Sequence, residues 1–267
     1  MYANVDDLTM YYEEHGAADG PPLVLLHGFT LTGRLTWNAH LDALGSAHHL
    51  VVPDLRGHGL TDNPAGSDAM NHHQFARDVH ALCQQLGIER AAFCGYSSGA
   101  MLLLNLALEH PELVASAVLV SGTFTIPEQT RADMRNMTVD ELAQSWFGPP
   151  DDPAAPYVPI SAAWHRALGD EHWRIVLADF LAIFSRSDAH DYPDPDRLTQ
   201  ITAPVLVLHG DRDAFFPANL PVELYQRLPD AELCILPRTE HELVESQPEL
   251  FRWLALDFLR RRYAPQR

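Results

Sequence analysis

The segment that decides the fold is AAFCGYSSGAMLLLNLAL, which spans Ala91–Leu108. It begins with a short apolar run, passes through a Gly-Tyr-Ser-Ser-Gly turn and continues as a long apolar run that stops at a Glu-His-Pro sequence. This pattern predicts a buried strand, a sharp turn and a buried helix. Because the chain reverses within so few residues, the turn needs glycine at Gly95 and Gly99, and Ser97 is pushed out at its apex.

The Gly-x-Ser-x-Gly pentapeptide is weak evidence by itself. It arises by chance in roughly one chain in ten of this length, and a glycine-bounded turn with a serine helix cap has the same sequence. The apolar runs on both sides supply the strand and helix that a nucleophile turn requires. We therefore interpret Ser97 as a nucleophile and expect its catalytic partners elsewhere in the chain.

Composition excludes several kinds of chemistry. The 267 residues carry a formal net charge of -18, from 36 acidic and 18 basic side chains, and every basic residue is an arginine. The absence of lysine excludes a P-loop lysine, a Schiff-base lysine and a lysine general base. The acidity argues against nucleic acids and anionic membranes as partners, and it is typical of a solvated surface.

Cysteine and histidine spacing argues against a metal or disulfide protein. The three cysteines Cys83, Cys94 and Cys234 form no C-x-x-C pair, and His241 is not followed by the second histidine of a zinc helix. We expect no metal and no cofactor. The N-terminus is polar and acidic, and no apolar run approaches the roughly 18 residues needed to cross a bilayer, so we expect a cytoplasmic protein.

Short apolar runs alternate with helical patterns along the chain. This alternation predicts a doubly wound, mostly parallel α/β sheet of about eight strands, with ligands bound beyond the carboxyl ends of the strands. The first run has the weaker alternation of an edge strand, and the others resemble strands buried on both faces. The expected strands are Thr9–Glu14, Leu23–Leu26, Leu50–Val52, Ala91–Cys94, Ala117–Val120, Val205–Leu208 and Glu232–Leu236.

The sequence changes character between residues 122 and 200. Proline-rich pieces there separate short helical patterns that are rich in aromatic residues. We interpret residues 122–200 as a helical lid inserted into a core made of residues 1–121 and 201–267. Because the chain is of a length that is commonly one domain, no second independent domain is required.

Loops that carry chemistry follow four of the predicted strands. They are His27-Gly28-Phe29, Asp54-Leu55-Arg56-Gly57-His58-Gly59, the Gly-Tyr-Ser-Ser-Gly turn and Gly210-Asp211-Arg212-Asp213, and His241 follows the last strand. With these motifs in this order, the sequence resembles the α/β-hydrolase superfamily over essentially its whole length. The resemblance is to serine esterases and lactonases whose oxyanion loop is of the His-Gly-x type.

The resemblance implies a Ser-His-Asp triad. Ser97 would be the nucleophile, His241 the general base and then acid, and Asp213 the carboxylate that orients the imidazole. Asp211 competes with Asp213 as the acid, although relatives usually place the acid at the fourth position of the segment. His209 also lies near, but it precedes Gly210 at a strand end and is expected to be packed.

The resemblance also implies an oxyanion hole made by the backbone N–H groups of Phe29 and Ser98. His27 and His58 match loop positions that are mainly structural in relatives. Ser98 departs from the family pattern because many relatives have methionine after the nucleophile. This departure makes the substrate harder to predict than the fold.

We expect a cofactor-free hydrolase that acts on a small, largely apolar ester or lactone. Alternatives are a carbon-carbon bond hydrolase, a perhydrolase on the same triad, and a ligand sensor that keeps the fold. The sequence does not predict the acyl chain length or the oligomeric state. Aromatic residues near the strand ends could line an apolar pocket. The candidates are Tyr96, Phe124, Trp146, Trp164, Phe180 and Phe215.

Overall fold

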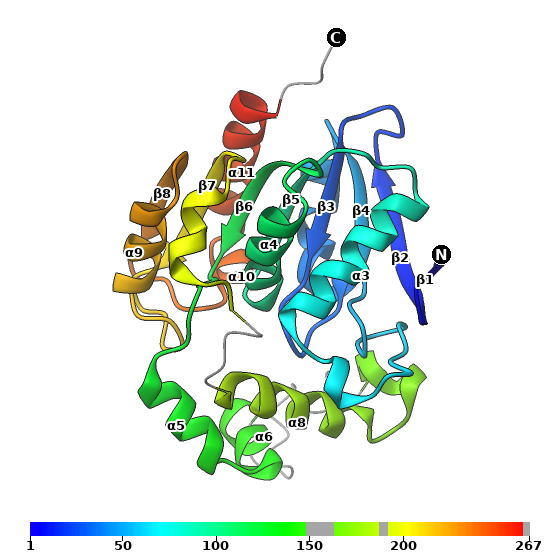
Figure 1. The fold of residues 1–267 in the computed structure, drawn as a ribbon, viewed down its shortest axis with the longest axis vertical. Coiled ribbons are helices and arrows are strands. Elements are labelled where there is room, and N and C mark those ends of the chain that lie inside the picture. The colour runs from blue at the N-terminus through cyan, green and yellow to red at the C-terminus, as the bar shows by residue number, and fades with distance from the viewer. Residues whose placement is uncertain (148–162, 187–191, 264–267) are drawn as a thin grey trace.

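The computed structural model describes residues 1–147, 163–186 and 192–263, and its centre is an eight-stranded sheet (Figure 1). The strands lie in the order β1-β2-β4-β3-β5-β6-β7-β8. Neighbours among β3 to β8 pair in parallel, whereas β2 pairs antiparallel with β1 and β4, so the predicted mostly parallel sheet is confirmed. The strands are β1 Tyr2–Val5, β2 Leu8–Gly16, β3 Pro22–Leu26, β4 His49–Pro53, β5 Ala91–Tyr96, β6 Val114–Val120, β7 Val205–Gly210 and β8 Ala231–Leu236.

The prediction of an edge strand at Thr9–Glu14 is wrong in its position within the sheet. The strand exists as β2, but it is covered on one side by β1 and on the other by β4. Sequence reasoning missed β1 because four residues are too few to establish an alternating pattern. In the structure the strand does alternate, with Ala3 and Val5 buried and Tyr2 and Asn4 exposed. The register brings Val5 opposite Leu8.

Helices cover both faces of the sheet, as a doubly wound fold requires. On β3 the side chains of Val24 and Leu26 belong to the apolar cluster under α3 and α4, while Leu23 and Leu25 belong to the cluster under α1, α2 and α11. Figure 1 shows α3 and α4 side by side on one face. The helices outside the segment between β6 and β7 are α1 Gly33–Trp37, η1 Asn38–His40, α2 Leu41–Gly45, η2 Ser67–Ala69, α3 His72–Gln85, α4 Ser98–Glu109, α9 Asn219–Arg227, α10 Leu243–Ser246 and α11 Pro248–Arg262.

A helical segment separates β6 from β7. Its helices α5 and α6 and the later helix α8 lie beyond the carboxyl ends of the strands (Figure 1). Their bounds, with the short turns η3 and η4, are α5 Glu128–Asn136, α6 Val139–Phe147, η3 Arg166–Leu168, α8 His172–Ser185 and η4 Pro195–Gln200. Residues 148–162 and 187–191, which belong to the predicted lid, lie outside the described residues. That the segment acts as a lid, with the boundaries given above, stays a prediction.

The turn between β5 and α4 has the steric requirements that its sequence predicts. Ser97 has φ 52° and ψ -115°, a backbone conformation that residues other than glycine rarely adopt. A Cβ at Gly95 would lie 2.3 Å from the Gly99 carbonyl oxygen, and one at Gly99 would lie 2.4 Å from the carbonyl oxygen of Leu26. The two glycines therefore allow strand, helix and the end of β3 to pack against one another around the exposed serine.

Candidate active site

Three side chains from three loops meet at the carboxyl end of the sheet. The Oγ atom of Ser97 lies 3.0 Å from Nε2 of His241, and Nδ1 of the same imidazole lies 2.8 Å from Oδ2 of Asp213. Ser97 follows β5, Asp213 follows β7 and His241 follows β8, so the parallel sheet brings together residues up to 144 positions apart. The arrangement is a hydroxyl, an imidazole and a carboxylate in one hydrogen-bonded line.

The carboxylate of Asp213 is firmly held. Its Oδ1 atom accepts hydrogen bonds from the backbone N–H groups of Phe215 and Phe216, which leaves Oδ2 for the imidazole of His241. Burial raises the pKa of this carboxyl, but the hydrogen bond and charge of His241 lower it more, so the pKa of Asp213 lies below its usual value. The group is therefore a carboxylate at neutral pH.

Asp211 and His209, the neighbours that competed for roles, make their hydrogen bonds to other partners, although Nε2 of His209 also lies 3.4 Å from Oδ2 of Asp213. Asp211 is exposed and accepts a hydrogen bond from the backbone N–H of Thr239 at 3.2 Å. His209 is fully buried and donates from Nε2 to the Phe216 carbonyl at 2.7 Å. Both side chains shape the loops around Asp213, and neither is hydrogen-bonded to His241.

A tight turn after β3 lies against the nucleophile. Leu31 donates its backbone N–H to the Gly28 carbonyl at 3.3 Å, which makes Phe29 and Thr30 the central residues of a β-turn. A Cβ at Gly28 would lie only 3.4 Å from the Ser97 Cβ, so the turn approaches the serine closely. No acceptor for the Phe29 amide is found within the described part of the chain. The amide is available for a ligand.

The opposite donor comes from the start of α4. Ser98 is the first residue of this helix, so its N–H has no acceptor within the helix. The N-terminus of a helix also carries partial positive charge, which favours an anion beside it. The Ser98 hydroxyl is bonded to Nε2 of His72, the first residue of α3, at 2.8 Å. Sequence reasoning missed this pair because nothing in the spacing links the two positions.

Aromatic rings connect the two halves of the site. Phe215 lies 4.9 Å from the His241 ring and 5.7 Å from Trp146, measured between centroids. Trp146 packs against Phe180 at 4.8 Å, and Phe180 lies 5.7 Å from Phe29. This line of rings runs from the imidazole to the turn after β3, so four sequence-predicted aromatics surround one region.

The remaining pocket candidates have different surroundings. Tyr96 is buried and its ring lies 5.5 Å from that of His241. Phe124 is buried with the Arg227 guanidinium 5.6 Å from its ring, and Trp164 is half-buried with no ring contact to the cluster among the described residues. Phe184, which stacks on Phe180 with centroids 4.3 Å apart, is a further member of the cluster.

Two histidines of the helical segment contact the loops of the sheet. His165 lies 3.0 Å from the backbone N of Gly59 and 3.1 Å from the Thr30 carbonyl oxygen. His172, the first residue of α8, donates from Nε2 to the Gly57 carbonyl at 2.8 Å. Sequence reasoning gave neither residue a role, because single histidines among the 15 in the chain carry no distinguishing spacing.

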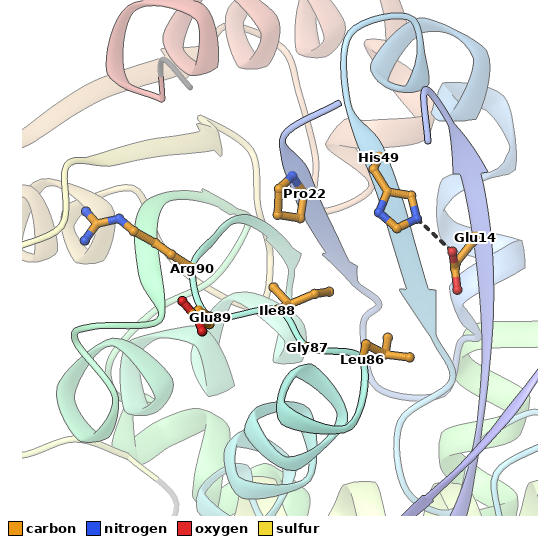
Figure 2. Close-up of a pocket in the computed structure, with 8 residues that line it drawn as sticks. All are labelled: Glu14, Pro22, His49, Leu86, Gly87, Ile88, Glu89 and Arg90. Carbon is orange, nitrogen blue, oxygen red and sulfur yellow. Dashed lines mark hydrogen bonds and ion pairs between the residues drawn. The ribbon is translucent and has the colours of Figure 1, made fainter. Parts of the chain in front are cut away.

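A cavity of about 450 Å³ lies at the opposite end of the strands (Figure 2). It is bounded by the first residues of β3 and β4, Pro22 and His49, and by the loop of residues 86–90 that leads into β5. His49 forms an ion pair with Glu14 at its edge, with 2.8 Å between Nε2 and Oε2. The cavity is remote from Ser97, which follows the other end of β5.

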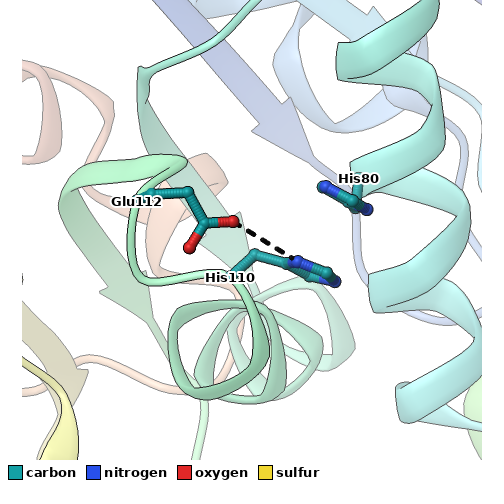
Figure 3. A group of neighbouring side chains, drawn as sticks. All are labelled: His80, His110 and Glu112. Carbon is teal, nitrogen blue, oxygen red and sulfur yellow. Dashed lines mark ion pairs between the residues drawn. The ribbon is translucent and has the colours of Figure 1, made fainter.

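Three surface side chains lie close enough to be considered as metal ligands. They are His80 on α3 and His110 and Glu112 after α4 (Figure 3). The two imidazole rings are stacked, with centroids 3.5 Å apart and 11° between their planes. A metal ion lies in the plane of each imidazole that binds it, and lone pairs in two parallel planes do not converge. As they stand, the rings do not fit a metal, and His110 pairs with Glu112 at 3.6 Å.

None of the described helices combines the length and the apolar character that a membrane span requires.

Comparison with known proteins places this arrangement in context. A model of the α/β-hydrolase fold family matches residues 21–149. "Putative carbamate hydrolase RutD" of Azorhizobium caulinodans is 27% identical over 268 residues, which cover 96% of this chain and 97% of the relative. "Non-heme chloroperoxidase" of Streptomyces lividans is 27% identical over 265 residues, which cover 92% of this chain and 94% of the relative.

A solved structure is also similar to this chain in its fold. Est816, described as an N-acyl homoserine lactone degrading enzyme, superimposes with a TM-score of 0.78 at 25% identity, over 97% of this chain and 100% of its own. Fold, family model and relatives that match over most of their length all agree with the resemblance that the loop motifs predict. This chain has the α/β-hydrolase fold, and its residues 21–149 match the model of that family.

Proposed function

We propose that this protein is a serine hydrolase that cleaves a carboxylic ester or a lactone through an acyl-enzyme. The observation that carries the proposal is the continuous hydrogen-bonded line from Ser97 through His241 to Asp213, with distances of 3.0 and 2.8 Å. A serine hydroxyl is a poor nucleophile at neutral pH and needs a base within such reach. The carboxylate holds the imidazole with Nε2 free to accept the hydroxyl proton.

In the first half of the reaction, the Ser97 oxygen attacks the carbonyl carbon and its proton passes to Nε2 of His241. The negative charge that forms on the carbonyl oxygen is stabilised by the N–H groups of Phe29 and Ser98. The carbon-oxygen bond to the leaving group then breaks, and the alkoxide takes the proton from His241. With a lactone, the alcohol stays attached to the acyl group.

In the second half, water attacks the acyl-enzyme with His241 as the base. Its proton moves to Nε2, the hydroxide adds to the acyl carbon, and collapse of the tetrahedral intermediate returns the proton to Ser97 as the acid leaves. The buried carboxylate of Asp213 stabilises the imidazolium that exists between the proton transfers. No group outside the described site is needed for this cycle.

The aromatic line from Phe215 to Phe29 supports a largely apolar substrate with one polar carbonyl. Est816, whose described activity is degradation of N-acyl homoserine lactones, is consistent with a lactone, and the relative named as a carbamate hydrolase makes a carbamate the first alternative carbonyl to test. The Ser98–His72 pair brings a polar group to a position where many relatives have methionine, so the pocket is not wholly apolar.

The test is hydrolysis of p-nitrophenyl esters of increasing acyl length, an N-acyl homoserine lactone and an aryl carbamate by the wild type and Ser97→Ala. We expect repeated turnover of an ester or lactone by the wild type and a fall in kcat of at least about 10⁴-fold in the variant. The matched control is Ser121→Ala. Ser121 also has a positive φ (49°) and directly follows the neighbouring strand β6, but it is fully buried, and its variant should retain turnover.

Other outcomes would identify the alternatives. Retained turnover in Ser97→Ala would overturn the mechanism. Turnover only of a β-diketone, or only of acetate with hydrogen peroxide, would favour a carbon-carbon bond hydrolase or a perhydrolase. A single slow turnover together with a ligand-dependent rise in thermal stability would favour a sensor.

A further inference from the structure

His165 joins three parts of the chain that are far apart in sequence. It lies just before η3, in the segment between β6 and β7, and is fully buried. Its Nδ1 atom is 3.0 Å from the backbone N of Gly59, 106 positions away, and its Nε2 atom is 3.1 Å from the carbonyl oxygen of Thr30, 135 positions away. One imidazole therefore bridges the loop after β4 and the turn after β3.

These partners define the state of the ring. The Gly59 amide can only donate, so Nδ1 accepts, and the Thr30 carbonyl can only accept, so Nε2 carries the proton. The ring is neutral and both of its nitrogens are used. Burial, opposed by the hydrogen bond to Thr30, lowers the pKa of His165 to about 4, which agrees with a neutral ring at pH 7.

The contact with Thr30 falls at a strained point. Thr30 has φ +64°, which is rare for a β-branched residue, and it is the third residue of the β-turn that contains Phe29. Such strain persists only where surrounding contacts hold the backbone. Phe29 carries the N–H that would serve as an oxyanion donor, and a single peptide group, that between Phe29 and Thr30, separates this N–H from the Thr30 carbonyl. Its orientation and that of the Phe29 amide are thus coupled through the same short turn.

We propose that His165 is a positioning residue for the oxyanion hole, which holds the Phe29 N–H in its productive direction by fixing the Thr30 carbonyl from the helical segment. The inference rests on the proposed function, because it presumes that Phe29 stabilises an oxyanion. It goes further by making the hole depend on a residue outside the loops that carry the motifs. The helical segment then contributes to the rate of the chemistry as well as to the lining of the pocket.

Two contacts separate positioning from general packing. The bond to Gly59 anchors the helical segment to the loop after β4, a loop that His172 also holds through Gly57. The bond to Thr30 is the one that reaches the turn with the strained φ. If the role is positioning, the Thr30 bond controls the rate, whereas the Gly59 bond contributes to stability alone.

Two amide side chains can test the bonds one at a time. In His165→Asn, the amide oxygen can take the place of Nδ1 and accept from Gly59, but the side chain is too short to reach Thr30. In His165→Gln, the amide nitrogen can take the place of Nε2 and donate to Thr30, while the bond to Gly59 is lost. His165→Ala removes both bonds.

We expect kcat for the best ester to fall by about 10- to 100-fold in the Ala and Asn variants, with KM little changed, because the Phe29 donor is displaced rather than removed. His165→Gln should stay within about threefold of the wild type. A boronic acid, whose adduct with Ser97 places an oxygen in the hole, should lose affinity in parallel with kcat across the series. Thermal unfolding midpoints report folding for each variant.

Equal kcat values in the Asn and Gln variants, or a kcat in His165→Ala that matches the wild type, would overturn the proposal. So would inhibition by the boronic acid that does not follow kcat. Failure of the proposed function is a separate result, because it appears in the wild type as absent turnover of every ester, lactone and carbamate. In that case the rate at which a fluorophosphonate labels the Ser97 oxygen, which also needs the hole, decides between the Asn and Gln variants.

Discussion

The two halves of the candidate site are held in place in different ways. The triad half is built from residues that follow the parallel strands β5, β7 and β8, and its carboxylate is held by backbone amides two and three residues further along the same loop. The half around Phe29 is fixed by two histidine side chains that link its turn to the loop after β4, and one of them, His165, comes from the helical segment. His27 bonds to the Gly28 carbonyl and the Leu55 amide, and His165 bonds to Thr30 and Gly59.

This difference teaches that the two halves should respond to different perturbations. The triad half depends on a few charged hydrogen bonds, so a change to one atom of the carboxylate should reduce the rate and leave the fold intact. The half around Phe29 depends on imidazoles that are neutral and buried, and it should respond to acid. Predictions that separate the two halves follow from the largest expected effect to the smallest.

The largest effect is expected for Asp213→Asn. The amide oxygen can still accept from Phe215 and Phe216, but the amide N–H₂ then faces Nδ1 of His241 and forces the proton to Nε2, where it points at Ser97. The imidazole can no longer act as a base, so kcat should fall by about 10⁴-fold. Steady-state kinetics measure the fall, and circular dichroism should show an unchanged fold.

Asp211→Asn is the matched control for this change, because it removes the same charge two residues earlier in the same loop. Asp211 accepts from the Thr239 amide and has no bond to His241, so kcat should stay within about threefold. A fall in Asp211→Asn that equals the fall in Asp213→Asn would mean that both carboxylates orient the imidazole. The assignment of Asp213 as the sole orienting acid would then be wrong.

The same difference explains how much of the molecule could be predicted from its sequence. The sheet, the turn at Ser97 and the loops that carry Asp213 and His241 follow from local patterns, namely apolar runs ended by glycine or aspartate. In a parallel sheet the carboxyl ends of such runs meet without any further information. The triad candidates were therefore accessible from the sequence alone.

The resemblance implies the two donors of the other half, Phe29 and Ser98, but the contacts that hold them were not accessible in this way. His165 and His72 each act on a residue more than 25 positions away, through single hydrogen bonds that leave no periodic or motif signal. The same holds for β1, whose four residues become a strand only because β2 is beside them. Contacts of this kind are decided by packing, and a sequence pattern predicts them only when several positions repeat.

The second effect concerns stability in acid. Burial lowers the pKa of His27 to about 3 and that of His165 to about 4, and it lowers the pKa of His58 well below the ordinary value of 6.5. As pH falls through 6.5, the unfolded chain binds protons that the folded chain refuses, so the free energy of unfolding decreases. Each such histidine contributes a loss of about 1.4 kcal/mol per pH unit until its folded pKa is reached.

Asp54 opposes this loss. Burial raises the pKa of this carboxyl to about 6 from 3.8, so between these values the folded chain binds a proton that the unfolded chain lacks. Burial also raises the pKa values of Asp179 and Glu245, but among the described residues the histidines whose pKa is lowered outnumber these carboxyls, so the net direction is still destabilisation. Urea unfolding at pH 7 and pH 5 measures it, and His165→Gln should reduce the difference between the two pH values by about 2 kcal/mol. An unchanged difference in that variant would contradict a neutral, buried His165.

The smallest effect is expected for His172→Ala, and it sharpens the comparison within the helical segment. His172 donates one hydrogen bond to the Gly57 carbonyl from a half-buried position, so its loss should lower the free energy of unfolding by about 1 kcal/mol. His73 is a matched control, because it also lies in the first turn of a helix and also has one partner, the Glu109 carboxylate, at 2.6 Å.

His73 and Glu109 are both partly exposed, so His73→Ala should cost at most about 0.5 kcal/mol. Urea unfolding at pH 7 of the two variants gives the comparison directly. Because the hydrogen bond of His172 goes to Gly57 and not to the turn at Thr30, His172→Ala should leave kcat nearly unchanged even though it loosens the same loop that His165 contacts. If its kcat instead fell as far as that of His165→Ala, the position of the Phe29 amide would depend on docking of the whole helical segment. The single hydrogen bond from His165 to Thr30 would then not be the cause.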